Sequence, residues 1–145
     1  MMGIKKVRPC VKIEEEVSEL PLPLQIIVRG IQSLTAKYSD GADLEVVHTE
    51  TALEARILRR KLLLEYNKDH EELKVMFEKY GEGYFFTKCV LVKCDMETAK
   101  DIIHYVRLML CDAIDTFAVK VPDSLLSLFS AKAEAQETQQ ETQTA

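Results

Sequence analysis

Residues 51–66, TALEARILRRKLLLEY, combine apolar and basic side chains in a pattern that is typical of a helix. At about 100° per residue, the apolar side chains fall on two nearly opposite faces. One face carries Ala55, Leu58, Leu62 and Tyr66, and the other carries Leu53, Ile57 and Leu64. The pattern predicts a helix that begins at a capping threonine, Thr49 or Thr51, and ends near Tyr66. A helix with two apolar faces must be covered on both sides, so we expect Leu53, Ile57 and Leu64 to contact another subunit or a partner protein.

Three arginines of this stretch, Arg56, Arg59 and Arg60, fall on one seam between the two apolar faces. Such a seam can be a solvated or internally paired surface. Because Leu63 projects among the three arginines, it can also be the rim of a protein interface. A third interpretation is contact with the phosphates of a nucleic acid. The formal net charge of −5 gives the chain no overall attraction for nucleic acid.

The chain on either side of this segment alternates between further helices and two strands. Period-two alternation predicts a strand over 4–14, and aromatic and β-branched residues predict a stronger one over 84–93. Apolar stripes at helical spacing predict helices over 24–38, 69–81 and 95–117, with a short helix over 123–129. Residues 43–47 fit a short strand or the lead into the next helix, and we favour the lead-in.

These elements predict an α+β fold in which four main helices pack on a small sheet of two or three strands. We expect the sheet to be antiparallel, because so small a sheet cannot be buried on both faces. Residues 1–130 are expected to form one domain. Residues 131–145 contain no aromatic or branched aliphatic side chain, so they are expected to be a disordered polar tail.

The residues that could support catalysis or metal binding are few. Cys89 and Cys94 have opposite parity on the predicted strand, and no CxxC or HxxxH spacing occurs. The sequence therefore predicts no metal site and no bound cofactor. His104 and Cys111 lie two turns apart on the last long helix, too far for a direct hydrogen bond. They are the candidates for an enzyme whose site assembles from distant residues.

The ends of the chain and its thiols bear on where it works. The N-terminus lacks the apolar segment of a signal peptide, and no apolar run approaches the ~20 residues that cross a bilayer. We therefore expect a soluble, cytoplasmic protein with reduced cysteines. The leading functional hypothesis is a non-enzymatic protein-interaction module, either a subunit of a larger assembly or a small homo-oligomer. A nucleic-acid-associated protein using the arginine seam is the alternative, and an enzyme is the second.

Overall fold

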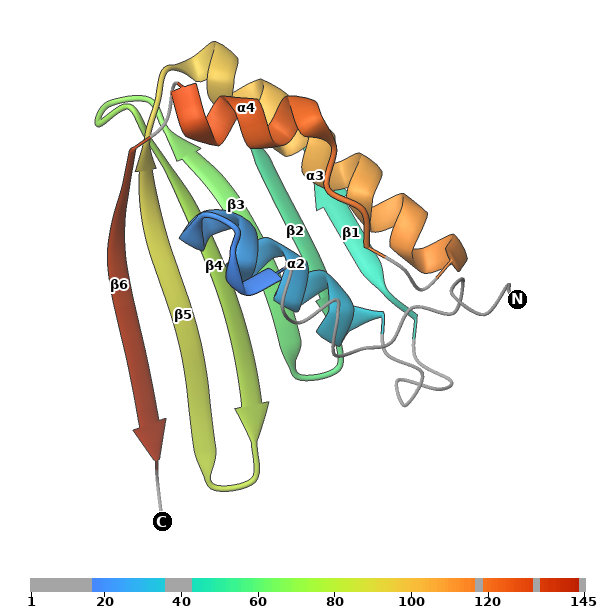
Figure 1. Cartoon of the computed structure of the whole chain (residues 1–145). Helices are drawn as coiled ribbons and strands as arrows, with labels where there is room; N and C mark the ends of the chain where they lie inside the picture. Colours follow the sequence, from blue (N-terminus) through green and yellow to red (C-terminus); the bar gives the residue numbers. More distant parts are fainter. Residues whose placement is uncertain (1–16, 36–42, 117–118, 132–133, 144–145) are drawn as a thin grey trace.

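The computed structural model describes residues 17–35, 43–116, 119–131 and 134–143 of the chain (Figure 1). Within these residues, three helices lie beside one antiparallel sheet of six strands. The helices are α2 (Leu22–Leu34), α3 (Met96–Thr116) and α4 (Asp123–Ala131). The strands are β1 (Glu45–His48), β2 (Ala52–Ile57), β3 (Arg60–Asn67), β4 (Glu72–Gly81), β5 (Tyr84–Lys93) and β6 (Glu134–Gln143).

The sheet is a meander in which strands follow one another in chain order from β1 to β5. Leu64 lies opposite Leu53 on one side and opposite Val75 on the other, and Val75 lies opposite Val90. This register sets one buried row across four strands. The chain returns after α3 and α4 to add β6 antiparallel to the outer edge of β5.

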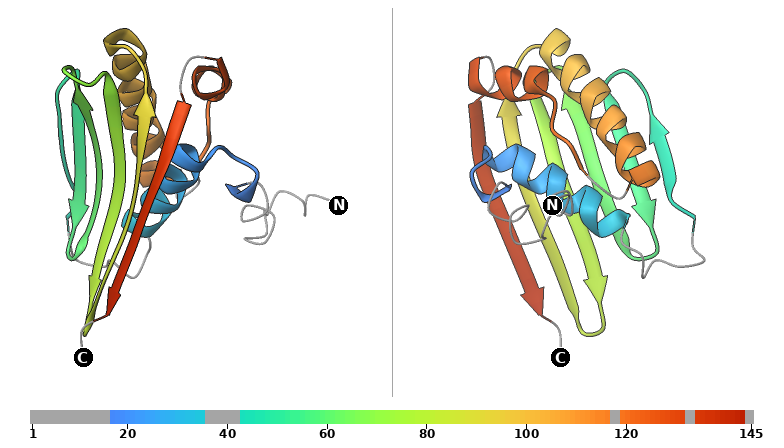
Figure 2. Two further views of the ribbon diagram at one scale, coloured as in Figure 1. Left: turned by 90° about the vertical axis from the view of Figure 1, so that its left-hand side faces the viewer. Right: turned by 45° about the vertical axis from the view of Figure 1, so that its right-hand side comes forward.

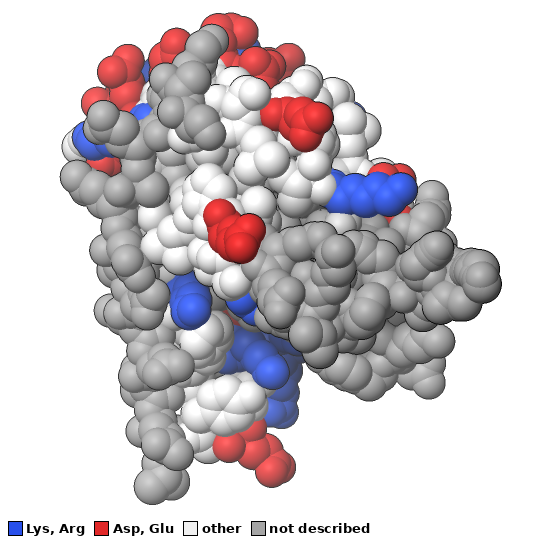
Figure 3. Space-filling view, in the orientation of Figure 1, with Lys and Arg blue, Asp and Glu red and all other residues white. Residues whose placement is uncertain are grey.

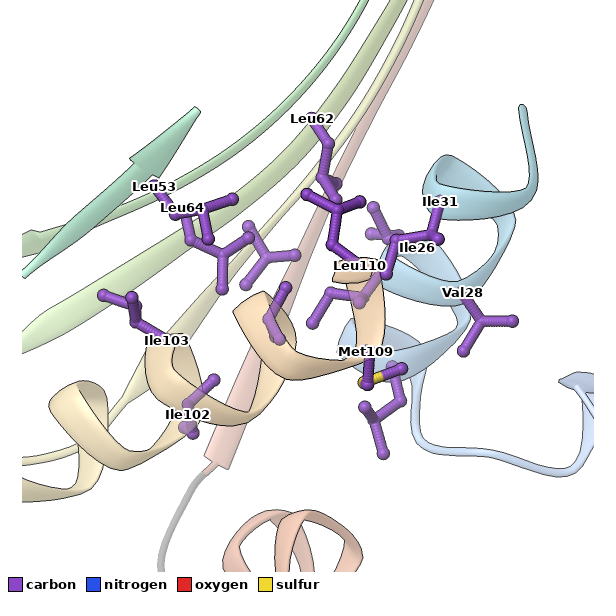
Figure 4. Close-up of a cluster of buried hydrophobic side chains, with 14 of the residues drawn as sticks. Ile26, Val28, Ile31, Leu53, Leu62, Leu64, Ile102, Ile103, Met109 and Leu110 are labelled. Carbon is purple, nitrogen blue, oxygen red and sulfur yellow. The ribbon is translucent and has the colours of Figure 1, made fainter. Parts of the chain in front are cut away.

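All three helices lie on the same side of the sheet (Figure 2, left). The core forms between that side and helices α2 and α3, and Figure 4 shows part of it, including Leu53, Leu62 and Leu64 from the sheet with Ile31 and Leu110 from the helices. Helix α2 approaches the strands closely at Gly30. A methyl group added there would lie 3.1 Å from side-chain carbons of both Leu62 and Phe77. Glycine therefore lets α2 lie directly on β3 and β4.

The prediction of a mostly helical protein with a small sheet is wrong. Residues 51–66, predicted as a helix, form the hairpin of β2 and β3. A two-residue turn at Leu58 and Arg59, with Leu58 at φ 52°, joins the strands. Buried side chains alternate within each strand, but the turn shifts their parity. A helical projection over both strands therefore produced two apolar faces that do not exist.

The helix predicted over 69–81 is likewise a strand, β4. Leu73, Val75 and Phe77 are its buried residues and share one parity. The polar residues at its start form a turn, in which Asn67 Oδ1 accepts hydrogen bonds from the backbone N–H groups of Asp69 and His70. An asparagine side chain stabilises a turn in this way without starting a helix.

Two further corrections concern the edges of the sheet. Residues 45–48 form β1 rather than the lead into a helix. The stretch expected to be a disordered tail contains β6, which pairs along the whole of β5. The expectation considered only the burial of side chains, whereas an edge strand is also held by backbone hydrogen bonds to its neighbour.

Other predictions hold. The strand over 84–93 is β5, and the helices over 24–38, 95–117 and 123–129 correspond to α2, α3 and α4. Helix α2 ends at Leu34, and residues 36–38 and 117 lie outside the described residues. The strand predicted at 4–14 lies outside the described residues. Among the residues that the structure describes, none of the helices is long and apolar enough to span a bilayer.

Candidate functional site

The side of the sheet opposite the helices is uncovered by any described element, and we call it the open face (Figure 2, left). Its centre is apolar. Leu63 on β3 lies opposite Met76 on β4, and Met76 lies opposite Cys89 on β5. Leu91 follows two residues after Cys89 and therefore shares its face. All four side chains are only partly buried. We call these four residues the open-face patch.

Charged side chains surround the open-face patch and pair with one another. The ion pairs are Lys61 with Glu78 at 3.6 Å, Lys93 with Glu72 at 3.1 Å, and Arg56 with Glu45 at 3.2 Å and Glu54 at 3.7 Å. Exposed pairs of this kind add little stability. Their effect here is to neutralise the charge around the apolar centre. An apolar centre inside a polar rim is the usual anatomy of a protein interface.

The thiol of Cys89 contributes to the apolar character of the patch. Burial raises its pKa above the ordinary value of 9.0, and the nearby charge of Lys74 opposes this only in part. The neutral thiol is therefore the form at neutral pH. A neutral cysteine packs as a small hydrophobic side chain, so Cys89 extends the apolar row from Met76 to the outer strands.

One end of the open face is hollowed. A depression of about 440 Å³ lies beside Leu91, and its lining comes from β3, the turn that follows it, β4 and β5. The residues that line it are Glu65, Tyr66, Asn67, Lys68, Glu72, Lys74 and Leu91. At the other end, the rings of Tyr80 and Phe85 lie with their centroids 4.7 Å apart. Tyr80 is half exposed. The open face therefore has a depression at one end, an aromatic pair at the other and an apolar centre between them.

The three leucine and isoleucine residues predicted to contact a partner lie elsewhere. Leu53 and Leu64 have no exposed surface, and Ile57 is 4% exposed. Their side chains face helices α2 and α3 and belong to the core of the same chain. The burial of these three side chains, which we expected from a partner protein, is thus provided by the same chain.

The predicted arginine seam is also divided. Arg56 points to the open face, where it pairs with Glu45. Arg59 lies in the β2–β3 turn, and Arg60 is 6% exposed on the helical side, where it donates a 2.6 Å hydrogen bond to the carbonyl oxygen of Ser33. The three side chains do not form one surface for a nucleic acid.

Basic side chains gather elsewhere on the helical side. Figure 3 shows them near the ends of the strands that extend beyond α2, with acidic side chains mostly over the helices. The register gives this side Lys79, two residues after Phe77, and Lys88, which lies opposite Phe77. The ammonium group of Lys88 is 6.0 Å from the ring centroid of Phe86.

The two residues considered for catalysis are not brought together. His104 lines a second hollow, which it shares with His48 from the end of β1. Cys111 is exposed on α3 and does not line that hollow. No group of three or more histidine, cysteine or acidic side chains within the described residues could hold a metal ion. Sequence spacing could not have paired His48 with His104, because only the meander brings β1 beside α3.

Comparison of the chain with protein-family models, with curated proteins and with solved structures gave no match.

Proposed function

We propose that the chain is a non-enzymatic protein-interaction module that self-associates through its open face, with two copies packing sheet against sheet. The observation that carries the proposal is the open-face patch, which lies at the centre of a sheet face that no described element covers. In antiparallel sheets with one solvated face, that face is usually polar. The row of Leu63, Met76 and Cys89 departs from this pattern.

Charge supports a second copy as the occupant. On β1 to β5, the open face carries five acidic residues and four basic residues. They are Glu45, Glu54, Glu65, Glu72 and Glu78, and Arg56, Lys61, Lys74 and Lys93. These five strands therefore give the face a charge close to zero, although the chain has a formal net charge of −5. Two such faces related by a two-fold axis can approach with little net repulsion, and each can pair its rim with the opposite charges of the other.

The dimensions of the sheet also suit a stable contact. With strands about 4.8 Å apart and about 3.4 Å per residue, six strands whose longest members have 10 residues span about 24 Å by 34 Å. That is about 800 Å² of flat face per copy, the size of a standard specific interface. Stacked sheets would lie about 10 Å apart, with their strands aligned to within about 30°.

Pairing through the exposed edge is the competing mode of self-association. The two edges of the sheet are β1, which has only four residues and carries Glu45, and β6, which has 10 residues, three of them glutamates. Short edge strands and charged residues on an edge both resist edge-to-edge pairing. The open face is therefore the stronger candidate.

Sedimentation velocity over a wide range of protein concentration tests the proposal. The unmodified chain should form dimers, and Met76→Lys should weaken them at least tenfold, because each buried side chain contributes about 1.5–3 kcal/mol and the symmetric contact loses two. Leu108→Lys is the matched control, since Leu108 is 46% exposed on α3, away from the open face. Circular dichroism and urea denaturation check that both variants are folded.

A monomer at about 1 mM for the unmodified chain would refute self-association. Dimers that survive Met76→Lys but dissociate on a proline substitution in an edge strand, β1 or β6, such as Val47→Pro in β1, would assign the contact to a sheet edge instead of the open face.

A further inference from the structure

A second hollow lies away from the open face, between the end of β1 and helix α3. Its volume is about 440 Å³, and it is lined by His48, Thr49, Glu50, Lys100, Ile103, His104 and Arg107. His48 lies opposite Leu53, whose side chain faces the helices, so this hollow is on the helical side of the sheet. A ligand here would not compete with packing of the open face.

Nitrogen donors converge on this hollow from two elements. Lys100, His104 and Arg107 are spaced four and three residues apart, so they form one strip along successive turns of α3. His48 lies on β1, on the other side of the hollow. Four side chains that carry or can gain a positive charge therefore line one space, although the chain as a whole is acidic.

A single carboxylate, Glu50, lines the hollow. It pairs with Lys100 at 3.3 Å, but its side chain is 81% exposed. An exposed pair is held weakly, so an incoming anion can replace Glu50 at the Lys100 ammonium group.

The hydroxyl group of Thr49 adds a donor at the rim. Its oxygen accepts a hydrogen bond from the backbone N–H of Thr51 at 3.2 Å, and its own proton can be donated to a ligand. The backbone N–H of Thr49 is bonded to the carbonyl oxygen of Ala52 at 2.8 Å, which fixes the turn. The donor on this side is therefore held in place by the β1–β2 turn.

We propose that this hollow binds a small organic phosphate. The planar guanidinium group of Arg107 can donate two parallel hydrogen bonds to phosphate oxygens, while Lys100 supplies a compact charge. His48, His104 and Thr49 complete the ring of donors. The volume exceeds what one phosphate group needs and falls within the range of small-molecule sites, so the remaining space receives the organic part of the ester.

Nuclear magnetic resonance of the histidine rings gives a direct test, because the chain has three histidines. Inorganic phosphate, glucose 6-phosphate and glucose are titrated at fixed pH and ionic strength. Both phosphates should shift the ring signals of His48 and His104 to saturation, with glucose 6-phosphate binding more tightly and glucose causing no shift. His70, in the β3–β4 turn, lies outside the hollow and is the internal control.

Two substitutions with opposite expected signs sharpen the test. Arg107→Gln should weaken binding of glucose 6-phosphate at least tenfold, and Glu50→Gln should tighten it, because it removes the competing carboxylate. Arg59→Gln, which changes an exposed arginine of the β2–β3 turn, should leave binding unchanged. Parallel shifts at all three histidines, or equal binding by the Arg107→Gln and Arg59→Gln variants, would overturn the proposal. Equal affinity for inorganic phosphate and glucose 6-phosphate would overturn the assignment of an organic ester.

Discussion

Three consecutive leucines in β3 provide a sharp test of the fold and of the open face. Leu62 and Leu64 have no exposed surface and face the helices, whereas Leu63 between them faces the other way and is partly exposed. We expect Leu62→Ala and Leu64→Ala to destabilise the monomer strongly and Leu63→Ala to do so only slightly. A helix would instead place Leu62 and Leu64 on nearly opposite faces.

The expected magnitudes follow from burial. Replacing a fully buried leucine by alanine costs about 2.7–5.0 kcal/mol, because a cavity remains where the side chain was. The cavity at Leu62 would open beneath α2, since a methyl group built on Gly30 lies 3.1 Å from Leu62 Cδ1. Full burial of a leucine is worth about 1.5–3 kcal/mol, so the partly exposed Leu63 should contribute about 1 kcal/mol to the monomer.

Urea denaturation at low protein concentration measures these differences. With a slope of about 1–3 kcal/mol per molar urea, the midpoint should fall by about 1–5 M for Leu62→Ala and Leu64→Ala and by less than about 1 M for Leu63→Ala. At higher concentration, Leu63→Ala should also weaken the dimer. A loss for Leu63→Ala in the monomer as large as that for Leu64→Ala would refute the assignment of faces.

Two further predictions concern the outer strand and a buried thiol. Ending the chain at Ala131 removes β6, so the amides of β5 that face it should exchange hydrogen faster and the melting temperature should fall; unchanged exchange along β5 would contradict this pairing. Burial, and secondly the charge of Asp95, raise the pKa of Cys94 from 9.0 to about 11. Because the folded state holds this proton more tightly than the unfolded state, the free energy of unfolding should fall as pH rises from about 9 to about 11. Cys94→Ala should reduce that pH dependence in urea denaturation curves, and an unaltered dependence would exclude Cys94 as a source.

The elements that sequence patterns predicted correctly are those with one unambiguous signal. Strand β5 is rich in aromatic and β-branched residues, and α3 carries a long stripe at helical spacing. Strands β3 and β4 were predicted as helices because their buried residues are accompanied by apolar residues on the opposite face, whereas β2 alternates cleanly but was read in one projection with β3. The run Leu62, Leu63, Leu64 gives no alternation at all, and Met76 between Val75 and Phe77 has the same effect.

The site on the helical side could not have been found from sequence spacing. His48 and Arg107 belong to elements whose proximity depends on how the meander places β1 beside α3. Lys100, His104 and Arg107 recur at helical spacing, but charged faces of helices are usually only solvated. This helix face differs from an ordinary solvated one because a hollow lies beside it. The hollow depends on how the elements pack, so spacing in the sequence does not reveal it.

The open face links the failed prediction to the proposed function. A strand in a sheet with one solvated face should alternate between apolar and polar residues, and Leu63 and Met76 break that rule at neighbouring positions of β3 and β4. Such departures cost solubility and invite aggregation, so they are expected where a surface is used. Leu63 and Met76, which break the strand alternation in the sequence, are thus the residues that we propose to lie at the centre of the interface. Substituting Leu63 or Met76 by threonine should therefore restore the alternation, leave the fold of the monomer intact and weaken self-association.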